Sequence, residues 1–205
     1  MIGFYNYTVW LTFIGMLSST VGIGFAVGGK ITAAVICLMF SGFCDMFDGI
    51  VARTKKDRTD EEKRFGIQLD SLSDIVCFGV LPFVIGVSLG ANAWWQIAIM
   101  ALFALAGLIR LAYYNVTEET RQQQTSEKRK HYLGVPITSS ALSVPLLFCF
   151  KSLLGAAFPV AYTVLLLVNG ALFIVPEQVK KPSKAGLAVM LVLGIIFTAL
   201  ILIFR

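Results

Sequence analysis

Long apolar segments separated by short polar connections run through the whole chain. Each apolar segment holds roughly twenty residues, the length an α-helix needs to cross a hydrocarbon core of about 30 Å. The pattern predicts an all-α fold, a polytopic transmembrane helix bundle with about six to seven spanning helices. We expect these helices at 8–29, 31–52, 68–90, 93–116, 134–153, 156–175 and 186–204.

The composition supports a membrane location. The chain is 57% hydrophobic and 14% charged, whereas a soluble domain carries about 25% charged residues. We expect one integral membrane domain over 1–205, without a second soluble domain. The segment Met1–Tyr5 carries no basic side chain ahead of the first apolar run, so we expect that run to be a permanent helix rather than a cleaved signal.

Basic residues are concentrated in alternate connections. The second connection holds Lys55, Lys56, Arg58, Lys63 and Arg64, the fourth Arg121, Lys128, Arg129 and Lys130, and the sixth Lys180, Lys181 and Lys184; the opposite side has Lys30, Lys151 and Arg205. The positive-inside rule therefore predicts the N-terminus in the cytoplasm and the C-terminus outside. We expect the membrane to be a bacterial or archaeal plasma membrane. Basic residues split among loops favour membrane lipids as partners and argue against nucleic acid.

Four aspartates interrupt the second and third apolar segments. Asp45 and Asp48 are three residues apart, and Asp70 and Asp74 are four apart, so each pair lies on one face of its helix. If the two faces meet, the four carboxylates converge, and divalent cations such as Mg²⁺ or Mn²⁺ would offset their charge. A purely structural network is disfavoured because it would leave excess negative charge in a low dielectric. An intramembrane cation transporter stays open as an alternative.

Small and basic residues are interleaved with the aspartates. Gly49, Ala52 and Arg53 continue the face of Asp45 and Asp48, and Gly66 precedes Asp70 by one helical turn. Glycine lets a ligand approach the backbone, and arginine can form a forked contact with phosphate. Paired cations of this kind stabilise displacement at phosphorus. A transporter has no evident use for these positions, so the pattern favours phosphate-group transfer.

Arg110 lies near the end of the fourth apolar segment. An intramembrane arginine costs about 2.5 kcal/mol or more, so such a residue usually faces a cavity or partner; the alternative is that it snorkels to the surface. The four cysteines, Cys37, Cys44, Cys77 and Cys149, lack metal-ligand spacing and are expected to be small buried hydrophobes.

The pattern D-x2-D-G-x2-A-R followed by G-x3-D-x3-D resembles the signature of the CDP-alcohol phosphotransferase family of membrane enzymes. The positions that match it are Asp45, Asp48, Gly49, Ala52, Arg53, Gly66, Asp70 and Asp74. Twelve residues separate Arg53 from Gly66, more than is usual in the family, and this leaves the geometry on the nucleotide side open.

Three stretches are similar to the branch of this family that forms phosphatidylserine. They are Leu69–Pro82, Arg110–Asn115 and Gly134–Ile137. Cys77, Leu81, Tyr113 and Thr138 depart from the residues typical of that branch.

The resemblance implies transfer of a phosphatidyl group from CDP-diacylglycerol to the hydroxyl of L-serine, with release of CMP, by a homodimer. It assigns one ion to Asp45, Asp48 and Asp70, and a second to Asp45, Asp70 and Asp74. Asp74 would also be the general base. Asp48, Gly49, Ala52, Arg53 and Gly66 would form the CDP pocket, and Arg110 would hold the serine carboxylate or the donor diphosphate. A sister enzyme acting on glycerol phosphate or inositol phosphate is the closer alternative, although such acceptors should demand further basic residues.

Overall fold

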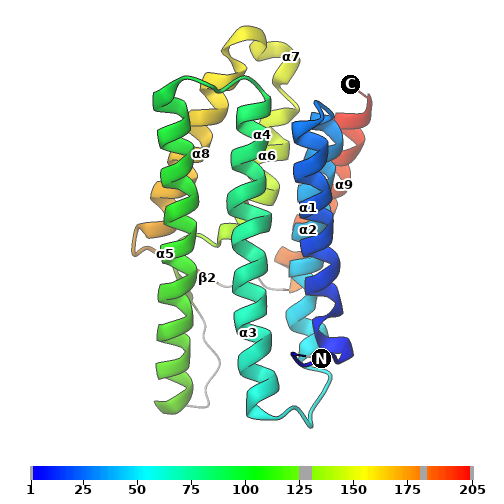
Figure 1. Cartoon of the computed structure of the whole chain (residues 1–205), viewed down its shortest axis with the longest axis vertical. Coiled ribbons are helices and arrows are strands. Elements are labelled where there is room, and N and C mark those ends of the chain that lie inside the picture. The colour runs from blue at the N-terminus through cyan, green and yellow to red at the C-terminus, as the bar shows by residue number, and fades with distance from the viewer. Residues whose placement is uncertain (1, 125–130, 181–183, 204–205) are drawn as a thin grey trace.

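The computed structural model describes residues 2–124, 131–180 and 184–203, and most of them lie in helices (Figure 1). In chain order the α-helices are α1 (Trp10–Val27), α2 (Ile31–Ala52), α3 (Asp60–Asp74), α4 (Leu81–Ser88), α5 (Trp94–Gln124), α6 (Ser140–Phe148), α7 (Lys151–Leu154), α8 (Phe158–Ile174) and α9 (Lys184–Ile203). The 3-10 segments η1 (Tyr7–Val9), η3 (Ile137–Ser139) and η4 (Gly155–Ala157) precede α1, α6 and α8, and the π-helical segment η2 (Ile75–Val80) joins α3 to α4.

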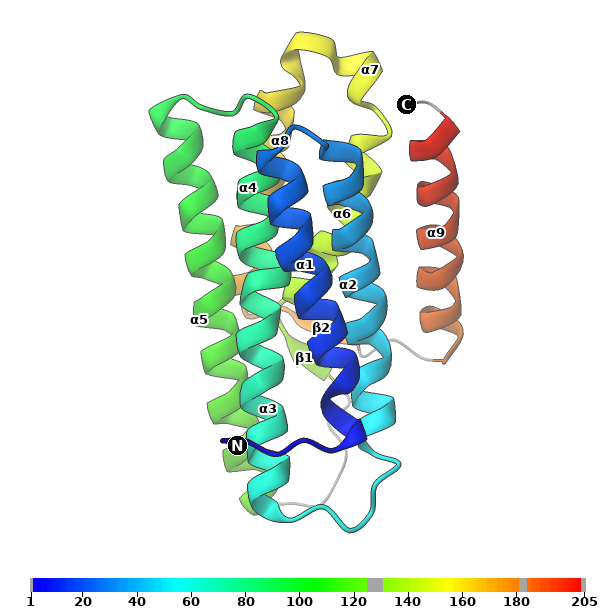
Figure 2. The same ribbon diagram turned by 45° about the vertical axis from the view of Figure 1, so that its right-hand side comes forward.

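Six helices among the described residues are long and apolar enough to cross a membrane. They are Tyr7–Val27, Ile31–Ala52, Asp60–Ser88, Trp94–Arg121, Lys151–Ile174 and Gly186–Ile203. The helix expected at 134–153 is shorter, since its apolar part covers Ile137–Phe148, and it begins partway along the bundle (Figure 2). The prediction of an all-α bundle with six to seven spanning helices is confirmed.

The long helices run side by side along the long axis of the molecule (Figures 1 and 2). α3, η2 and α4 form one continuous helical rod. α1 packs along α2, α5 packs along α8, and α9 lies at the edge against α2 and α6. Phe78, Leu81 and Ile85 on the rod are almost completely buried, so the rod that carries two of the aspartates is also the centre of the core.

A short two-stranded sheet ties the start of α6 to the end of α8. β1 (His131–Leu133) pairs antiparallel with β2 (Gln178–Lys180). Gly134 follows β1 with φ +73°, and a Cβ on it would lie 2.7 Å from the Phe173 carbonyl oxygen. Glycine is therefore required by both the backbone conformation and the close approach. These two strands were not predicted, and they fix where η3 and α6 begin.

Small residues let the helices approach closely. A Cβ on Gly42 would lie 2.6 Å from the Ala141 Cβ, so α2 and α6 are nearly in backbone contact at this level. On the neighbouring face of α2, the Ser41 hydroxyl donates to the Gly15 carbonyl oxygen on α1 at 2.8 Å. Small residues at such crossings are typical of helix packing in lipid. Together these contacts hold α2, which carries Asp45 and Asp48, between α1 and α6.

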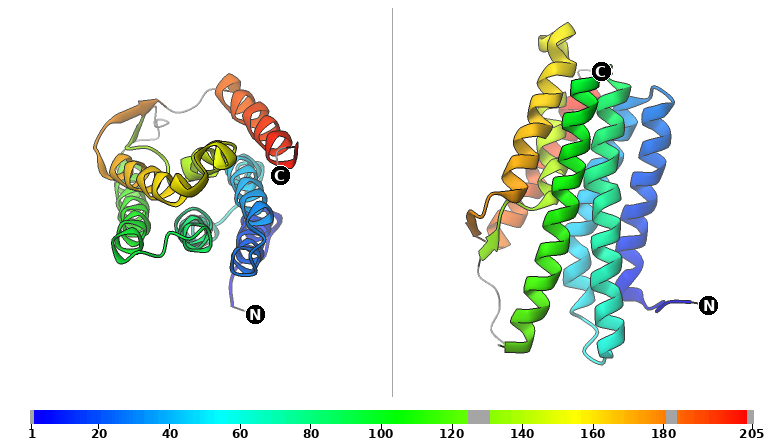
Figure 3. Two further views of the ribbon diagram at one scale, coloured as in Figure 1. Left: turned by 90° about the horizontal axis from the view of Figure 1, so that it is seen from above. Right: turned by 60° about the vertical axis from the view of Figure 1, so that its left-hand side comes forward.

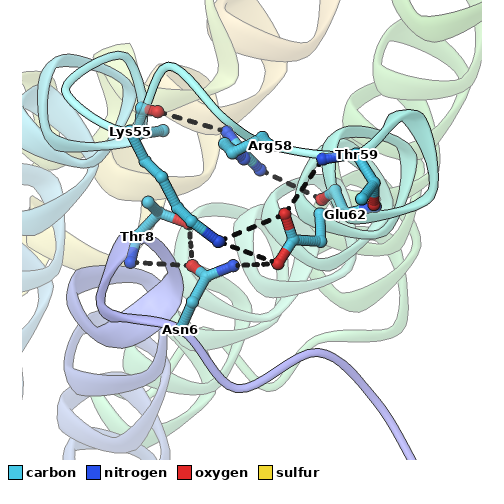
Figure 4. A network of polar contacts seen from close by, with 7 residues as sticks. Asn6, Thr8, Lys55, Arg58, Thr59 and Glu62 are labelled. Carbon is cyan, nitrogen blue, oxygen red and sulfur yellow. Dashed lines mark hydrogen bonds and ion pairs between the residues drawn. The ribbon is translucent and has the colours of Figure 1, made fainter.

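A polar network joins three segments at one end of the bundle (Figure 4). The Thr59 hydroxyl accepts from the Glu62 amide at 3.2 Å, and the Glu62 carboxylate accepts from the Thr59 amide at 3.0 Å, which is a capping box. Glu62 also accepts from Lys55 Nζ and from Asn6 Nδ2, each at 3.0 Å. α3 therefore begins at Asp60, earlier than the start predicted at 68, because part of the polar connection is helical.

The ends of the bundle differ in charge. The α2–α3 loop with Lys55, Lys56 and Arg58 lies at the same end as the N-terminus and the C-terminal end of α5 (Figure 1). The α1–α2 connection and α7 lie at the other end, which is also where α9 finishes (Figures 1 and 3). The basic residues Lys128, Arg129, Lys130, Lys181 and Arg205 lie outside the described residues. Assignment of the basic end to the cytoplasm stays a prediction.

Candidate active site

The two aspartate pairs meet where α2 faces α3. Asp45, Asp70 and Asp74 each offer a carboxylate oxygen, and these three oxygens lie within 4.8 Å of one another. Oxygen ligands bind Mg²⁺ or Ca²⁺ at about 2.0 to 2.6 Å, so two ligands on opposite sides of one ion are about 4 to 5 Å apart. The spacing of the three oxygens therefore fits a shared divalent cation, and hard carboxylate oxygens are the ligands that Mg²⁺ and Mn²⁺ prefer.

Asp48 lies beside this group of three. Its side chain interacts with that of Asp70, and its Oδ2 accepts from the Thr12 hydroxyl of α1 at 3.2 Å. Asp48 and Asp74 are each 9% exposed. Clustering carboxylates in a buried position is unfavourable without a compensating charge, and a divalent cation supplies that charge. Thr12 did not stand out in the sequence, because nothing in the first apolar run marks it as a partner of an aspartate.

Asp74 is the last residue of α3, and the backbone changes from α to π directly after it. Within η2, the Leu81 amide bonds to the Val76 carbonyl five residues back. π-helical turns inside longer helices occur frequently at functional sites. The sequence predicted one regular helix here, since the side-chain pattern carries no mark of the inserted residue.

A cavity of about 1670 Å³ opens beside the aspartates. Its charged part is lined by Arg53, Asp60, Lys63, Arg64, Glu118 and Glu119, from the ends of α2, α3 and α5. Its apolar part is lined by Ile36, Met39, Phe40 and Phe43 of α2 and by Leu187, Met190, Leu191, Ile195 and Leu202 of α9. Ligand pockets for drug-sized molecules measure about 300 to 1,000 Å³, so this cavity has room for a larger, amphipathic ligand.

Most of the residues singled out in the sequence line this cavity. All four aspartates do so, together with Gly49 and Arg53. Arg110 on α5 is 9% exposed and lines the same cavity. The structure therefore brings Arg110 to the wall of the cavity that holds the aspartates.

Ala52 and Gly66 are not among the residues lining the cavity. Both lie against Arg58, which belongs to the long α2–α3 loop and is labelled in Figure 4. Arg58 Nη1 donates to the Ala52 carbonyl at 3.4 Å, and Nη2 donates to the Glu62 carbonyl at 3.0 Å. A Cβ on Gly66 would lie 2.6 Å from Arg58 Nη2. Arg58 was not predicted to be near the site, because loop length alone does not say where a loop side chain lies.

The four cysteines are free thiols that differ in burial. Cys44 and Cys77 are buried, Cys37 and Cys149 are half-buried, and all four are free thiols. The carboxylate group that could hold an ion contains none of them. The burial of Cys44 and Cys77 fits small hydrophobic residues.

Comparisons with known proteins connect this geometry to a family. The model of the CDP-alcohol phosphatidyltransferase family matches residues 5–204. A CDP-diacylglycerol–serine O-phosphatidyltransferase of Saccharomyces cerevisiae is 35% identical over 54% of this chain and 40% of its own length. One of Helicobacter pylori is 33% identical over 68% of this chain and 54% of its own length. An archaetidylserine synthase of Methanothermobacter thermautotrophicus is 31% identical over 72% of this chain and 60% of its own length.

The chain thus spans about half the length of the first two of these curated relatives. The family model, in contrast, covers nearly the whole chain, including both aspartate-bearing helices and the cavity wall. The chain belongs to the CDP-alcohol phosphatidyltransferase family.

Proposed function

We propose that this protein transfers the phosphatidyl group of CDP-diacylglycerol to the hydroxyl of L-serine, giving phosphatidylserine and CMP. The observation that carries the proposal is the convergence of Asp45, Asp70 and Asp74 beside a cavity with a charged rim and an apolar wall. The choice of serine rests on the names of relatives that share the family.

In this reaction the serine oxygen attacks the phosphorus that carries the diacylglycerol. The bond between that phosphorus and the oxygen that bridges the two phosphorus atoms of the donor breaks. CMP leaves with this bridging oxygen. We assign Asp74 as the general base that takes the hydroxyl proton, because it is buried beside the other carboxylates at the end of α3. General bases of this kind must come within hydrogen-bond reach of the proton they remove.

We assign two divalent cations, Mg²⁺ or Mn²⁺, to the aspartates. Asp45, Asp48 and Asp70 would hold one ion, and Asp45, Asp70 and Asp74 the other. Bound there, the ions would neutralise the donor diphosphate during displacement. The hydrogen bond from Thr12 would keep the Asp48 carboxylate oriented, as outer-shell donors commonly do for metal ligands.

The donor would lie along the cavity. Gly49 and Arg53 line it next to the aspartates, where they would face the diphosphate and the cytidine. The apolar wall between α2 and α9 would take the acyl chains. Ala52 and Gly66 could contact cytidine only if Arg58 shifted away from Gly66 or itself took part in the contact. L-serine would enter from the charged end, which we place in the cytoplasm, and we infer a homodimer from the family resemblance.

A sister activity has one observation in its favour. Lys63 and Arg64 line the cavity rim, where they could attract a phosphate-bearing acceptor such as glycerol phosphate or inositol phosphate. However, Lys63 pairs with Asp60 at 2.9 Å and Arg64 approaches Glu119 at 3.8 Å. Their charge is thus partly compensated, which makes serine the better proposal.

The proposal is tested with purified protein, CDP-diacylglycerol, Mg²⁺ or Mn²⁺ and a panel of alcohols, with CMP release as the readout. The panel holds L-serine, glycerol phosphate and inositol phosphate, and the donor is supplied with ester-linked and with ether-linked chains. We expect serine-dependent CMP release that excess EDTA abolishes. Asp70→Asn should abolish it as well, because that carboxylate would serve both ions.

Each other outcome of this panel has a definite meaning. CMP release with a phosphate-bearing alcohol but not with serine would replace the proposed acceptor. Full turnover in excess EDTA would refute the role of the cations. If none of the alcohols in the panel supports CMP release, serine and both phosphate-bearing alcohols are refuted as acceptors.

A further inference from the structure

The guanidinium of Arg58 fills the space between the end of α2 and the first turns of α3. Its Nη1 donates to the Ala52 carbonyl at 3.4 Å, and its Nη2 donates to the Glu62 carbonyl at 3.0 Å (Figure 4). Ala52 is the last residue of α2, and Glu62 lies in the first turn of α3. Arg58 belongs to the loop of unusual length, outside the eight positions that match the family signature.

Gly66 has an open face that Arg58 covers. A Cβ on Gly66 would lie 2.6 Å from Arg58 Nη2 and 3.8 Å from Cζ. Apart from the chain neighbours of Gly66 and the backbone of its own helix, no other atom of the described residues lies within 4 Å of that position. We call the space between Ala52, Glu62 and Gly66 the α2–α3 slot. It holds one flat group, the guanidinium, against bare glycine backbone.

Arg58 keeps unused binding capacity. Its Nε is buried without a hydrogen-bond partner among the described residues. None of the ion pairs found in that part of the chain includes Arg58, whereas Lys55, Lys63 and Arg64 each approach a carboxylate. A buried donor without a partner is unfavourable, and the two bonds that hold the guanidinium go to neutral carbonyls. A ligand that meets this guanidinium with acceptor atoms or with a π-face therefore improves its environment.

The slot lies one helical turn from the carboxylate group. Ala52 follows Asp48 by four residues on α2, and Gly66 precedes Asp70 by four residues on α3, which is about 6 Å along each helix axis. If the donor diphosphate lies at the ions held by the aspartates, the next groups along the donor are the ribose and the cytosine ring. The ring is the flat group that would reach the slot.

We infer that Gly66 and Arg58 form the two faces of a slot for the cytosine ring of the donor, an inference that rests on the proposed function. In the ligand-free protein the guanidinium takes the place of the ring. The ring enters against Gly66, and the guanidinium gives up its bonds to the two carbonyls. It moves outward by about 3.5 Å, one contact distance, and stacks on the outer face of the ring, as guanidinium groups do on aromatic rings.

The test measures binding of CMP at equilibrium by isothermal titration calorimetry with Mg²⁺, so that its readout does not depend on turnover. We expect Arg58→Ala to raise the Kd for CMP about tenfold, through loss of one stacked face. Arg58→Tyr retains a flat face without a charge, and Arg58→Lys retains the charge without a flat face. The tyrosine variant should therefore bind CMP more tightly than the lysine variant does.

A second pair of variants tests the opposite face of the slot. In the Arg58→Ala background, an added Cβ at Gly66 meets no other atom of the described residues, so Gly66→Ala should not lower the melting temperature there. The added methyl group would still lie where the ring is placed. We expect it to raise the Kd for CMP by a further tenfold or so, since the ring loses its contact with the glycine backbone.

A matched control is Lys56→Ala. Lys56 is exposed and lies two residues before Arg58 in the same loop, so its loss removes one positive charge from the loop and leaves the slot intact. This variant should bind CMP as the unmodified protein does. A rise in Kd equal to that of Arg58→Ala would show that only the charge of the loop matters, which overturns the inference.

The results separate the possible failures. If the unmodified protein binds no CMP with Mg²⁺ or Mn²⁺, the proposed function fails. If it binds CMP and Arg58→Ala binds it equally well, the slot is refuted, and a lower melting temperature in that variant would mean that Arg58 only closes the end of α2. If the lysine variant keeps the affinity and the tyrosine variant loses it, Arg58 contacts a phosphate, which also overturns the inference.

Discussion

Asp74 combines two features at a single residue, since it belongs to the carboxylate group and ends the regular part of α3. Asp74→Asn keeps the shape of the side chain but removes its ability to take a proton. We expect the variant to bind CDP-diacylglycerol with the cation and to lose transfer by about 10²-fold or more. Binding of the donor and turnover are measured on the same preparation, and unchanged turnover would remove Asp74 from the role of base.

Arg110 is the second residue whose chemistry can be tested alone. Arg110→Lys keeps the positive charge and loses the planar fork that binds a carboxylate through two hydrogen bonds. If Arg110 holds the serine carboxylate, the Michaelis constant for serine should rise about tenfold and that for the donor should not. The opposite result would assign Arg110 to the donor diphosphate, and no effect on either constant would mean that it contacts neither substrate.

Some of these residues could be found from the sequence and others could not. The aspartates could be found because helical periodicity alone puts Asp45 with Asp48 and Asp70 with Asp74. The contacts of Thr12 and Arg58 depend on how helices and loops pack against one another. That information is not contained in local spacing.

At the scale of single elements, the start of α3 depends on the capping box at Thr59. Thr59→Ala removes the side-chain acceptor for the Glu62 amide and should cost about 1 kcal/mol. For a chain of this size that corresponds to a lower melting temperature by about 2 to 4 °C. Thermal unfolding in detergent measures the shift. Thr20→Ala, which changes an exposed threonine on α1, serves as the control and should melt as the unmodified protein does.

The elements themselves were predictable to different degrees. Apolar length located the helices well, because a spanning helix must be apolar over most of its length. The start of α3 was placed too late, since the charged residues at 60–67 resemble a loop by composition although the capping box makes them helical. The strand at 131–133 pairs with β2, and Gly134 follows it with a positive φ; a hydropathy pattern reveals neither feature.

At the scale of the whole molecule, the unequal charge of the two ends predicts orientation in the membrane. Lys56→Cys introduces an exposed thiol in the α2–α3 loop, and Asn92→Cys introduces one in the connection between α4 and α5. A membrane-impermeant thiol reagent added to intact cells should label Asn92→Cys and leave Lys56→Cys unlabelled. In permeabilised cells the reagent should label both variants. The unmodified protein gives the background labelling of the native cysteines. The reverse pattern would place the active site on the outer face.

The cavity joins a charged rim to an apolar wall between α2 and α9, so its two substrates would arrive from different phases. The concentration of the lipid donor is then a surface density, set by its mole fraction in the bilayer, whereas that of the acceptor is an ordinary molarity in water. Adding inert lipid at constant total donor should therefore slow turnover, although the bulk amount of every reactant is unchanged. In a living membrane, the rate would respond to the fraction of lipid present as donor rather than to the amount of donor per cell.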